Sequence, residues 1–159
     1  MAPREDFEQM LRGAALRVTR PRLAVLGAVH AQPHVDTDSI IVAVHQLSPE
    51  VSRQAVYNSL HTLADAGLLR RIQPAGSVAR YESRVGDNHH HMVCRSCSTI
   101  TDVDCAVGEA PCLTAADDHG FSIDEAEVTY WGLCRTCSAV ATGTATAAAT
   151  ETSIVQNSR

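Results

Sequence analysis

Apolar residues recur every three or four positions between residues 7 and 63, a spacing typical of amphipathic helices. The pattern predicts four helices. Pro21 suits the first turn of the second helix, and Asp36 or Thr37 can cap the third. Ser52 can cap the fourth helix, which is expected to close at Gly67. The side chains expected to face inward are Phe7, Met10, Leu11, Ala14, Leu23, Leu26, Val29, Ile40, Ile41, Val44, Leu47, Val56, Leu60 and Leu63.

Two short runs that follow these helices predict a β-hairpin. They span residues 68–72 and 78–82, on either side of a turn at residues 74–77. Helices followed by a small hairpin describe a winged helix-turn-helix. Such a unit can bind DNA, or it can serve as a dimerisation or protein-docking module. Polar side chains left for the outer faces of the fourth helix and the hairpin favour DNA binding. These residues are Arg53, Gln54, Tyr57, Asn58, His61, Arg70, Arg71 and Arg80.

The second half of the chain shows a mixed pattern. Residues 91–94, 98–102 and 123–131 are predicted strands, and a helix is expected from about Glu109 to His119, where Gly120 ends it. The fold class is therefore α+β, with a winged-helix domain at residues 1–84 and a small α/β domain at residues 85–139. Residues 140–159 lack a core-forming pattern and are expected to form a disordered tail.

Charge is distributed unevenly over the 159 residues, whose formal net charge is -5. Residues 1–84 hold ten arginines and eight acidic residues, whereas residues 85–159 hold three arginines and ten acidic residues. The chain has neither an apolar run long enough to span a membrane nor a secretory signal, so we expect a cytoplasmic protein. In a cytoplasmic chain, six cysteines between residues 94 and 137 indicate metal or redox chemistry before structural disulfides.

Four of these cysteines form two CxxC pairs. Four thiolates suit tetrahedral zinc, and a site closed by four protein ligands is structural. A CxxC pair can also be a redox motif or a disulfide, but two matched pairs in a cytoplasmic chain favour zinc. The expected zinc ligands are Cys94, Cys97, Cys134 and Cys137. Cys105 and Cys112 stand outside the pairs, and they either pack as small apolar side chains or form a thiol switch.

A second group of potential ligands lies just before the first CxxC pair. In a strand, His89 and His91 point to one side of the sheet and His90 to the other. Glu82 and Asp102 could add carboxylate oxygens. Imidazole and carboxylate ligands suit ferrous iron, manganese or zinc, and such a site could leave one coordination position open. A histidine run can also be a surface segment without any ligand role.

Several motifs occur together in a fixed order along the chain. They are Arg17-Val-Thr-Arg-Pro-Arg22, His34 before a helix, Arg53-Gln-Ala-Val-Tyr57, Arg80-Tyr-Glu82, the three consecutive histidines and the two CxxC pairs. From about residue 7 to residue 137 the chain resembles the ferric uptake regulator family. Residues 87–97 most resemble the actinobacterial branch of that family, which represses catalase-peroxidase genes.

This resemblance implies a homodimeric, metal-activated repressor that binds an AT-rich inverted-repeat operator in double-stranded DNA. The four paired cysteines match the structural Zn²⁺ site of the family. A regulatory site for Fe²⁺, or for Mn²⁺ or Zn²⁺, straddles the two domains in the family. Its expected ligands are His34, Glu82, His89, His91 and Asp102. The expected DNA contacts are Arg17 and Tyr57, beside Arg53 and Asn58 of the fourth helix.

The leading hypothesis is a repressor of antioxidant genes that senses hydrogen peroxide through Fe²⁺. In peroxide-sensing relatives, the oxidised positions match His34 and His89. Glu82 is typical of iron sensors and Asp102 of peroxide sensors, so a repressor that responds to iron availability is the first alternative. A thiol switch that ejects zinc is the second.

Two further expectations complete the interpretation. An accessory metal site found in some relatives matches only in part, at His90 and Glu109. An enzyme is not expected, because a four-sulfur zinc site is closed to substrate and the zinc-deaminase motif is absent.

Overall fold

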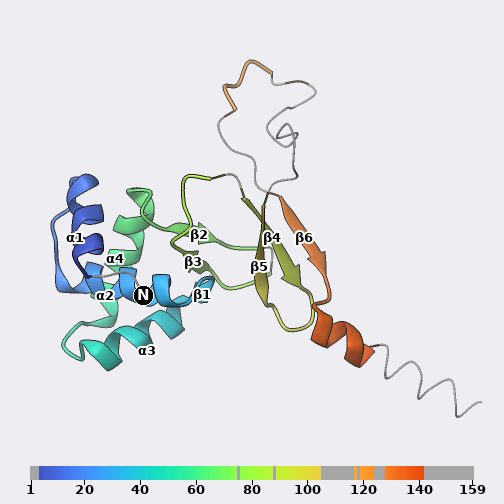
Figure 1. Ribbon diagram of the computed structural model, residues 1–159, viewed down its shortest axis with the longest axis horizontal. Helices are drawn as coiled ribbons and strands as arrows, with labels where there is room; N and C mark the ends of the chain where they lie inside the picture. Colours follow the sequence, from blue (N-terminus) through green and yellow to red (C-terminus); the bar gives the residue numbers. More distant parts are fainter. Residues whose placement is uncertain are drawn as a thin grey trace, which may run out of the picture. The chain divides into compact units, whose positions relative to one another are not determined.

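The computed structural model describes residues 4–74, 76–87, 89–104, 117, 119–123 and 128–141 (Figure 1). The chain divides into two compact units, Met1–Asp87 and Asn88–Arg159. Among the residues that the structure describes, no helix has the length and apolar character needed to cross a membrane.

Four helices form most of the first unit, as the sequence predicted. They are α1 (Arg4–Gly13), α2 (Arg20–Ala31), α3 (Thr37–Leu47) and α4 (Arg53–Asp65). Asp36 caps α3, because its Oδ1 accepts a hydrogen bond from the backbone N–H of Ser39 at 2.9 Å. Ser52 caps α4 in the same way, with its Oγ 3.2 Å from the backbone nitrogen of Ala55.

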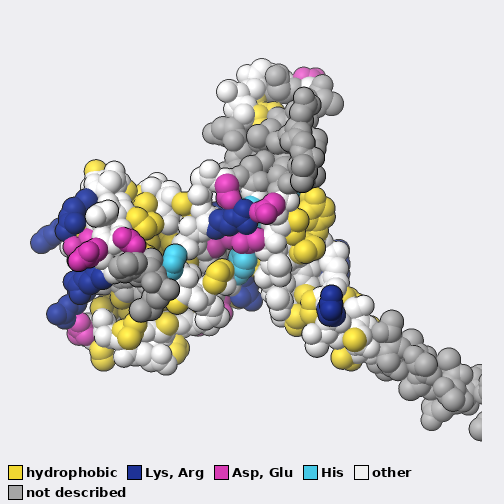
Figure 2. All heavy atoms as spheres, in the orientation of Figure 1, with side chains coloured by type: hydrophobic (Ala, Val, Ile, Leu, Met, Phe, Trp, Pro, Cys, Tyr) yellow, Lys and Arg dark blue, Asp and Glu magenta, His cyan; other side chains and the backbone are white. Residues whose placement is uncertain are grey.

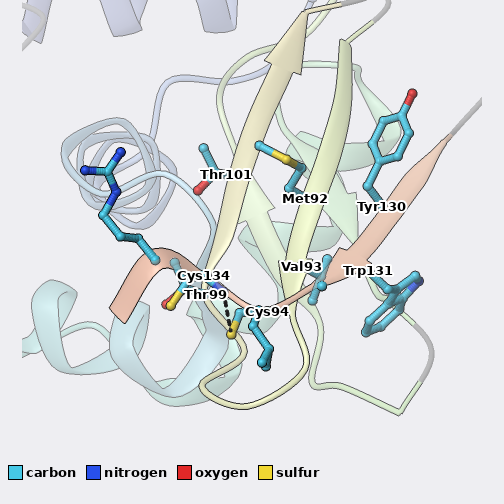
Figure 3. Close-up of a pocket in the computed structure, with 11 residues that line it drawn as sticks. Met92, Val93, Cys94, Thr99, Thr101, Tyr130, Trp131 and Cys134 are labelled. Atoms are coloured by element: carbon cyan, nitrogen blue, oxygen red, sulfur yellow. Dashed lines mark hydrogen bonds between the residues drawn. The ribbon is translucent and has the colours of Figure 1, made fainter. Parts of the chain in front are cut away.

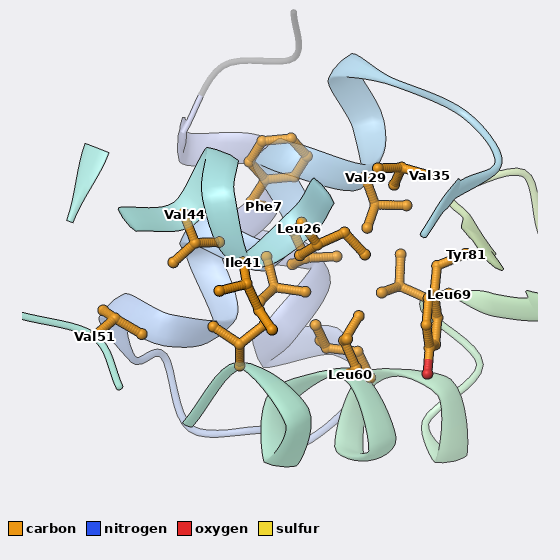
Figure 4. Packing of buried hydrophobic residues seen from close by; sticks show 14 of the residues in the cluster. Phe7, Leu26, Val29, Val35, Ile41, Val44, Val51, Leu60, Leu69 and Tyr81 are labelled. Atoms are coloured by element: carbon orange, nitrogen blue, oxygen red, sulfur yellow. The ribbon is translucent and has the colours of Figure 1, made fainter. Parts of the chain in front are cut away.

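The apolar faces of these helices enclose one hydrophobic core (Figure 4). Most of the predicted inward positions are buried, while Met10, Ala14 and Leu23 are only partly buried. The prediction for Leu47 is wrong: this side chain is 80% exposed, because it lies in the last position of α3, beyond the packed turns. The buried cluster consists of Phe7, Leu11, Val25, Leu26, Val29, Val35, Ile40, Ile41, Val44, Val51, Val56, Leu60, Leu63, Leu69 and Tyr81.

A small antiparallel sheet completes the first unit. Its strands β1 (Val35–Asp36), β3 (Arg80–Glu82) and β2 (Arg70–Ile72) lie in that order. The hairpin of β2 and β3 confirms the predicted wing, although both strands are shorter than the pattern indicated. The sequence did not predict β1, which pairs with the outer edge of β3. This pairing brings the segment before α3 beside the wing.

The second unit contains a three-stranded sheet of β4 (His89–Cys94), β5 (Ile100–Asp104) and β6 (Thr129–Gly132). The central strand β4 pairs antiparallel with β5 and parallel with β6. A helix then covers residues 135–141. Three strands were expected, but β4 begins two residues earlier than predicted, and β5 begins and ends two residues later.

Other predictions for this unit need correction or lie outside the described residues. Ile123 is not in a strand, and His119 and Gly120 lie in a turn with φ of 51° and 82°, so no helix reaches His119. Residues 140 and 141 are helical, whereas a disordered tail was expected from 140 onward. The remainder of that tail, and the residues Cys105, Glu109 and Cys112, lie outside the described residues.

Candidate metal centres and the outer face of the fourth helix

The four paired cysteines come together at one end of the β4, β5 and β6 sheet. Cys94 is the last residue of β4, and its register opposite Gly132 brings the end of β6 beside it. The four Sγ atoms all lie within 4.8 Å of one another, and those of Cys97 and Cys134 are 3.7 Å apart. All four thiols are free of disulfides. The cluster is therefore suited to one tetrahedral structural zinc ion.

Hydrogen bonds from the backbone and among the thiols separate the pKa values within this cluster. The backbone N–H of Cys134 donates to Cys94 Sγ at 3.3 Å, and this bond and one from the backbone of Cys97 lower the pKa of Cys94 to about 6 (Figure 3). The Ser96 hydroxyl acts to lower the pKa of Cys137. The nearby sulfurs of Cys134 and Cys97 outweigh it and raise the pKa of Cys137 to about 12. Four thiolates therefore need a cation to coexist here, as the donor set of a zinc site requires.

In the first unit, His34 and Glu82 form a buried pair. Their Nε2 and Oε2 atoms are 3.0 Å apart, and the side chains are 10% and 1% exposed. Glu82 is the last residue of β3, and β1 begins directly after His34. A carboxylate this deeply buried requires a charged partner, hydrogen bonds or a metal. The pair can supply one nitrogen and one oxygen ligand.

In the second unit, His89 and His91 share one side of β4, as strand alternation predicts. Their ring centroids are 4.9 Å apart, and both side chains are fully buried. Asp102 lies opposite His91 on β5, and its Oδ1 is 3.6 Å from His91 Nε2 and 3.9 Å from His89 Nε2. Three potential ligands therefore converge in this unit.

His90 takes the other side of β4. It is 3% exposed, its ring lies edge-on to Tyr130 at 6.4 Å, and its Nδ1 has no hydrogen-bond partner among the described residues. A role with Glu109 in an accessory metal site stays a prediction, because Glu109 lies outside the described residues.

The outer face of α4 is polar, as its pattern predicted. Val56, Ser59, Leu60 and Leu63 are buried. The exposed side chains of the helix include Arg53, Gln54, Tyr57, Asn58 and His61.

Two side-chain contacts organise this outer face. Arg53 Nη2 lies 3.2 Å from Asp38 Oδ1, and Gln54 Nε2 donates to Asn58 Oδ1 at 2.9 Å. Tyr57 is 39% exposed between them. The face thus offers amide and phenol groups, whereas its one arginine already has an acidic partner.

Four other arginines of the first unit differ in what they contact. Arg17 is exposed before α2. Arg4 and Arg12 on α1 both contact Glu8, and basic (blue) and acidic (magenta) side chains lie side by side over α1 in Figure 2. Arg80 differs from the expected DNA-facing arginines, because its Nη1 donates inward to the backbone carbonyl of His34 at 2.9 Å. No sequence signal marks this contact, since it depends on the pairing of β1 with β3.

The comparisons with known proteins agree with this architecture. The sequence profile of the ferric uptake regulator family matches residues 13–131. The chain belongs to this family. Fur family regulators are DNA-binding dimers, and the predicted α+β fold with an N-terminal winged helix is confirmed.

Individual members of the Fur family show how closely the chain is related. It is 70% identical over 133 residues to the transcriptional regulator FurA of Mycobacterium tuberculosis, covering 84% of this chain and 90% of that protein. This identity confirms the resemblance to the actinobacterial branch. The ferric uptake regulator of Vibrio cholerae is 26% identical, with a TM-score of 0.64 over 79% of this chain and 98% of that one.

A third relative supports the fold alone. The structure of the ferric uptake regulator from Pseudomonas aeruginosa with manganese has a TM-score of 0.67 and 24% identity. It covers 81% of this chain and 98% of that chain.

Proposed function

We propose that this chain is a transcriptional repressor that senses hydrogen peroxide through an Fe²⁺ site and controls antioxidant genes, including catalase-peroxidase genes. The observation that carries this proposal is a set of potential nitrogen and oxygen ligands, fully or partly buried, in each unit. His34 and Glu82 form the first set, and His89, His91 and Asp102 form the second. Such ligands suit Fe²⁺, and also Mn²⁺ or Zn²⁺.

In the proposed mechanism, one ion takes ligands from both sets and so couples the DNA-binding unit to the second unit. The coupled dimer presents its two α4 helices to successive major-groove faces, which are about 34 Å apart. Loss of the ion shifts the population away from this arrangement and releases DNA. The proposed partner is an AT-rich inverted-repeat operator, contacted by Arg17, Arg53, Tyr57 and Asn58. The protein would act in the cytoplasm as a regulator and not as an enzyme.

Peroxide sensing adds one chemical step. When bound, Fe²⁺ would supply the redox chemistry that splits hydrogen peroxide. One peroxide oxygen would be added to the imidazole of His34 or His89, which loses two electrons, and the other oxygen would leave as water. The first of these side chains is 10% exposed and the second fully buried, so an oxidant in bulk solvent reaches them poorly. Oxidation of these two side chains would therefore depend on an ion held beside them. An oxidised imidazole would be a weaker ligand, so the site would hold its ion less tightly.

Two alternatives have specific support. Glu82, where peroxide sensors carry aspartate, favours a repressor that responds to iron availability. The 3.7 Å separation of the sulfurs of Cys97 and Cys134 favours a thiol switch. Hydrogen peroxide could oxidise these two thiols to a disulfide, being itself reduced to two molecules of water, and zinc would then be ejected.

The deciding experiment uses the zinc-loaded protein under anaerobic conditions. The protein is loaded with Fe²⁺ and bound to its own promoter DNA, and stoichiometric hydrogen peroxide is added. DNA release is followed by fluorescence anisotropy, and the peptides are then analysed by mass spectrometry. Peroxide sensing predicts release together with an added oxygen on the peptides that hold His34 or His89. His45→Ala, which removes a histidine of α3 outside both ligand sets, is the matched control and should respond as the wild type does.

Each alternative predicts a different result in the same sample. Release by an iron chelator but not by peroxide would identify an iron-availability repressor. DNA release that is accompanied by disulfide formation and zinc loss, with no oxidised histidine, would show that the cysteines are the sensing residues.

A further inference from the structure

The backbone of His34 has an unusual conformation. Its φ is +56°, in the left-handed region that residues other than glycine seldom adopt. Such a conformation persists only where the surrounding structure holds it. His34 lies between the end of α2 and the start of β1, so regular secondary structure does not impose it.

Two side chains of β3 contact His34, one at its backbone carbonyl and the other at its imidazole ring. Arg80 Nη1 donates to its backbone carbonyl at 2.9 Å, and the Glu82 carboxylate lies 3.0 Å from its ring nitrogen Nε2. Arg80 and Glu82 are two positions apart on one strand, so they share a face of the sheet. The pairing of β1 with β3, which sets Asp36 opposite Arg80, fixes this arrangement.

Arg80 also lies beside the cap of α3. Its positive charge contributes to lowering the pKa of Asp36, after the hydrogen bonds from the backbone and hydroxyl of Ser39. The guanidinium therefore donates to one carbonyl oxygen and places its positive charge near the Asp36 carboxylate.

We propose that Arg80 is a positioning residue of the regulatory metal site. By holding the carbonyl of His34, it keeps the imidazole of His34 directed at Glu82 before a metal arrives. This inference rests on the proposed function, in which His34 and Glu82 are metal ligands. It replaces the sequence-based expectation that Arg80 faces DNA.

Loss of Arg80 would allow the backbone of His34 to leave its left-handed conformation. Part of the free energy of metal binding would then be used to fix the imidazole of His34 in place, so the metal affinity would fall. Residues that orient metal ligands typically change metal affinity by about 10-fold to 100-fold when they are replaced. A DNA contact would behave differently: its loss would weaken operator binding and leave metal affinity unchanged.

The test uses the full-length, zinc-loaded protein and Co²⁺ as a spectroscopic probe for the second metal site. Arg80→Ala is expected to weaken Co²⁺ binding by about 10-fold to 100-fold and to change the visible absorption bands of the bound ion. Arg80→Gln retains an N–H donor and should recover part of the affinity and the wild-type spectrum. The matched control is Arg71→Ala, which removes an exposed arginine of the neighbouring strand β2 and should leave both unchanged.

Two ligand variants separate failure of this inference from failure of the proposed function. His34→Ala and Glu82→Ala should abolish the second Co²⁺ equivalent. If they do so while Arg80→Ala and Arg80→Gln keep wild-type affinity and spectrum, the positioning role is refuted and the metal site stands. If the ligand variants bind Co²⁺ normally, the metal site itself is refuted, and the role of Arg80 with it. If Arg80→Ala does not fold, the same Co²⁺ affinities and spectra are measured for Arg80→Gln and Arg80→Lys. Wild-type affinity and spectrum in both variants would refute the positioning role.

Discussion

Removal of the zinc ion should unfold the second unit and leave the first unit folded. The simplest perturbation is Cys134→Ser, which removes one of the four clustered sulfurs. Cys112→Ser is the matched control, since it removes a cysteine that belongs to neither CxxC pair. It should retain zinc and wild-type stability.

The difference between the units follows from what each one buries. Among the described residues of the second unit, the buried apolar side chains are Val93, Cys94 and Ile100, whereas the core cluster of the first unit holds fifteen. Full burial of a valine or isoleucine side chain contributes about 1.5–3 kcal/mol. A structural zinc ion contributes about 10–16 kcal/mol to folding. The metal therefore outweighs the apolar side chains that are buried among the described residues of this unit.

The assay combines zinc content, circular dichroism and tryptophan fluorescence. Trp131 is the chain's one tryptophan, it lies on β6, and its ring is 5.2 Å from the Arg95 guanidinium carbon. In Cys134→Ser we expect a red-shifted Trp131 emission, loss of dimers in sedimentation, and a retained helical signal from α1 to α4. A zinc-free Cys134→Ser with wild-type Trp131 emission and dimerisation would refute the reasoning. Simultaneous loss of the helical signal would also refute it.

Three further predictions follow from the described geometry. Leu60→Ala should destabilise the first unit by about 2–5 kcal/mol, because Leu60 is fully buried. Urea unfolding followed by the helical signal measures this loss, and a loss below about 1 kcal/mol would contradict the packing. Zinc affinity should fall as the pH falls, since the raised pKa of Cys137, about 12, means that zinc must displace its proton. The test is a series of competition titrations with a chelator at pH values well above the pKa of Cys94, which is about 6; a zinc affinity that does not change with pH over that range would refute a protonated Cys137. Asn58→Ala should reduce the preference for one A·T pair in the operator by about 1–3 kcal/mol, because the amides of Gln54 and Asn58 are exposed on α4. The measurement is a scan of operator variants, with His61→Ala as the control. An unchanged base preference in Asn58→Ala would argue against recognition of a base by this amide.

The sequence could predict those parts of the fold that depend on residues close together along the chain. Asp36 and Ser52 cap α3 and α4, and the apolar spacing that follows each cap defines its helix without reference to distant contacts. The CxxC pairs are equally local, because two thiols separated by two residues form half of a zinc site wherever the chain places them.

The parts that sequence could not predict depend on pairing between distant segments. The strand β1 exists because it borders β3, and the bond from Arg80 to His34 joins residues 46 positions apart. Periodicity alone also does not locate the last packed turn of a helix, which is why Leu47 was expected in the core and is exposed.

The two metal chemistries can be kept apart because their ligands differ. Soft thiolates select zinc, whereas imidazoles and carboxylates accept Fe²⁺ or Mn²⁺. In the proposed function this separation allows the regulatory ion to be lost or its ligands oxidised while the zinc ion still holds β4, β5 and β6 together. A repressor switched through His34 and His89 would then remain a folded dimer that can be reloaded or degraded. A repressor switched through Cys97 and Cys134 would release its DNA and also lose the fold of its second unit. The two mechanisms therefore differ in the product of the reaction with peroxide, which is a zinc-containing protein in the first case and a zinc-free protein in the second.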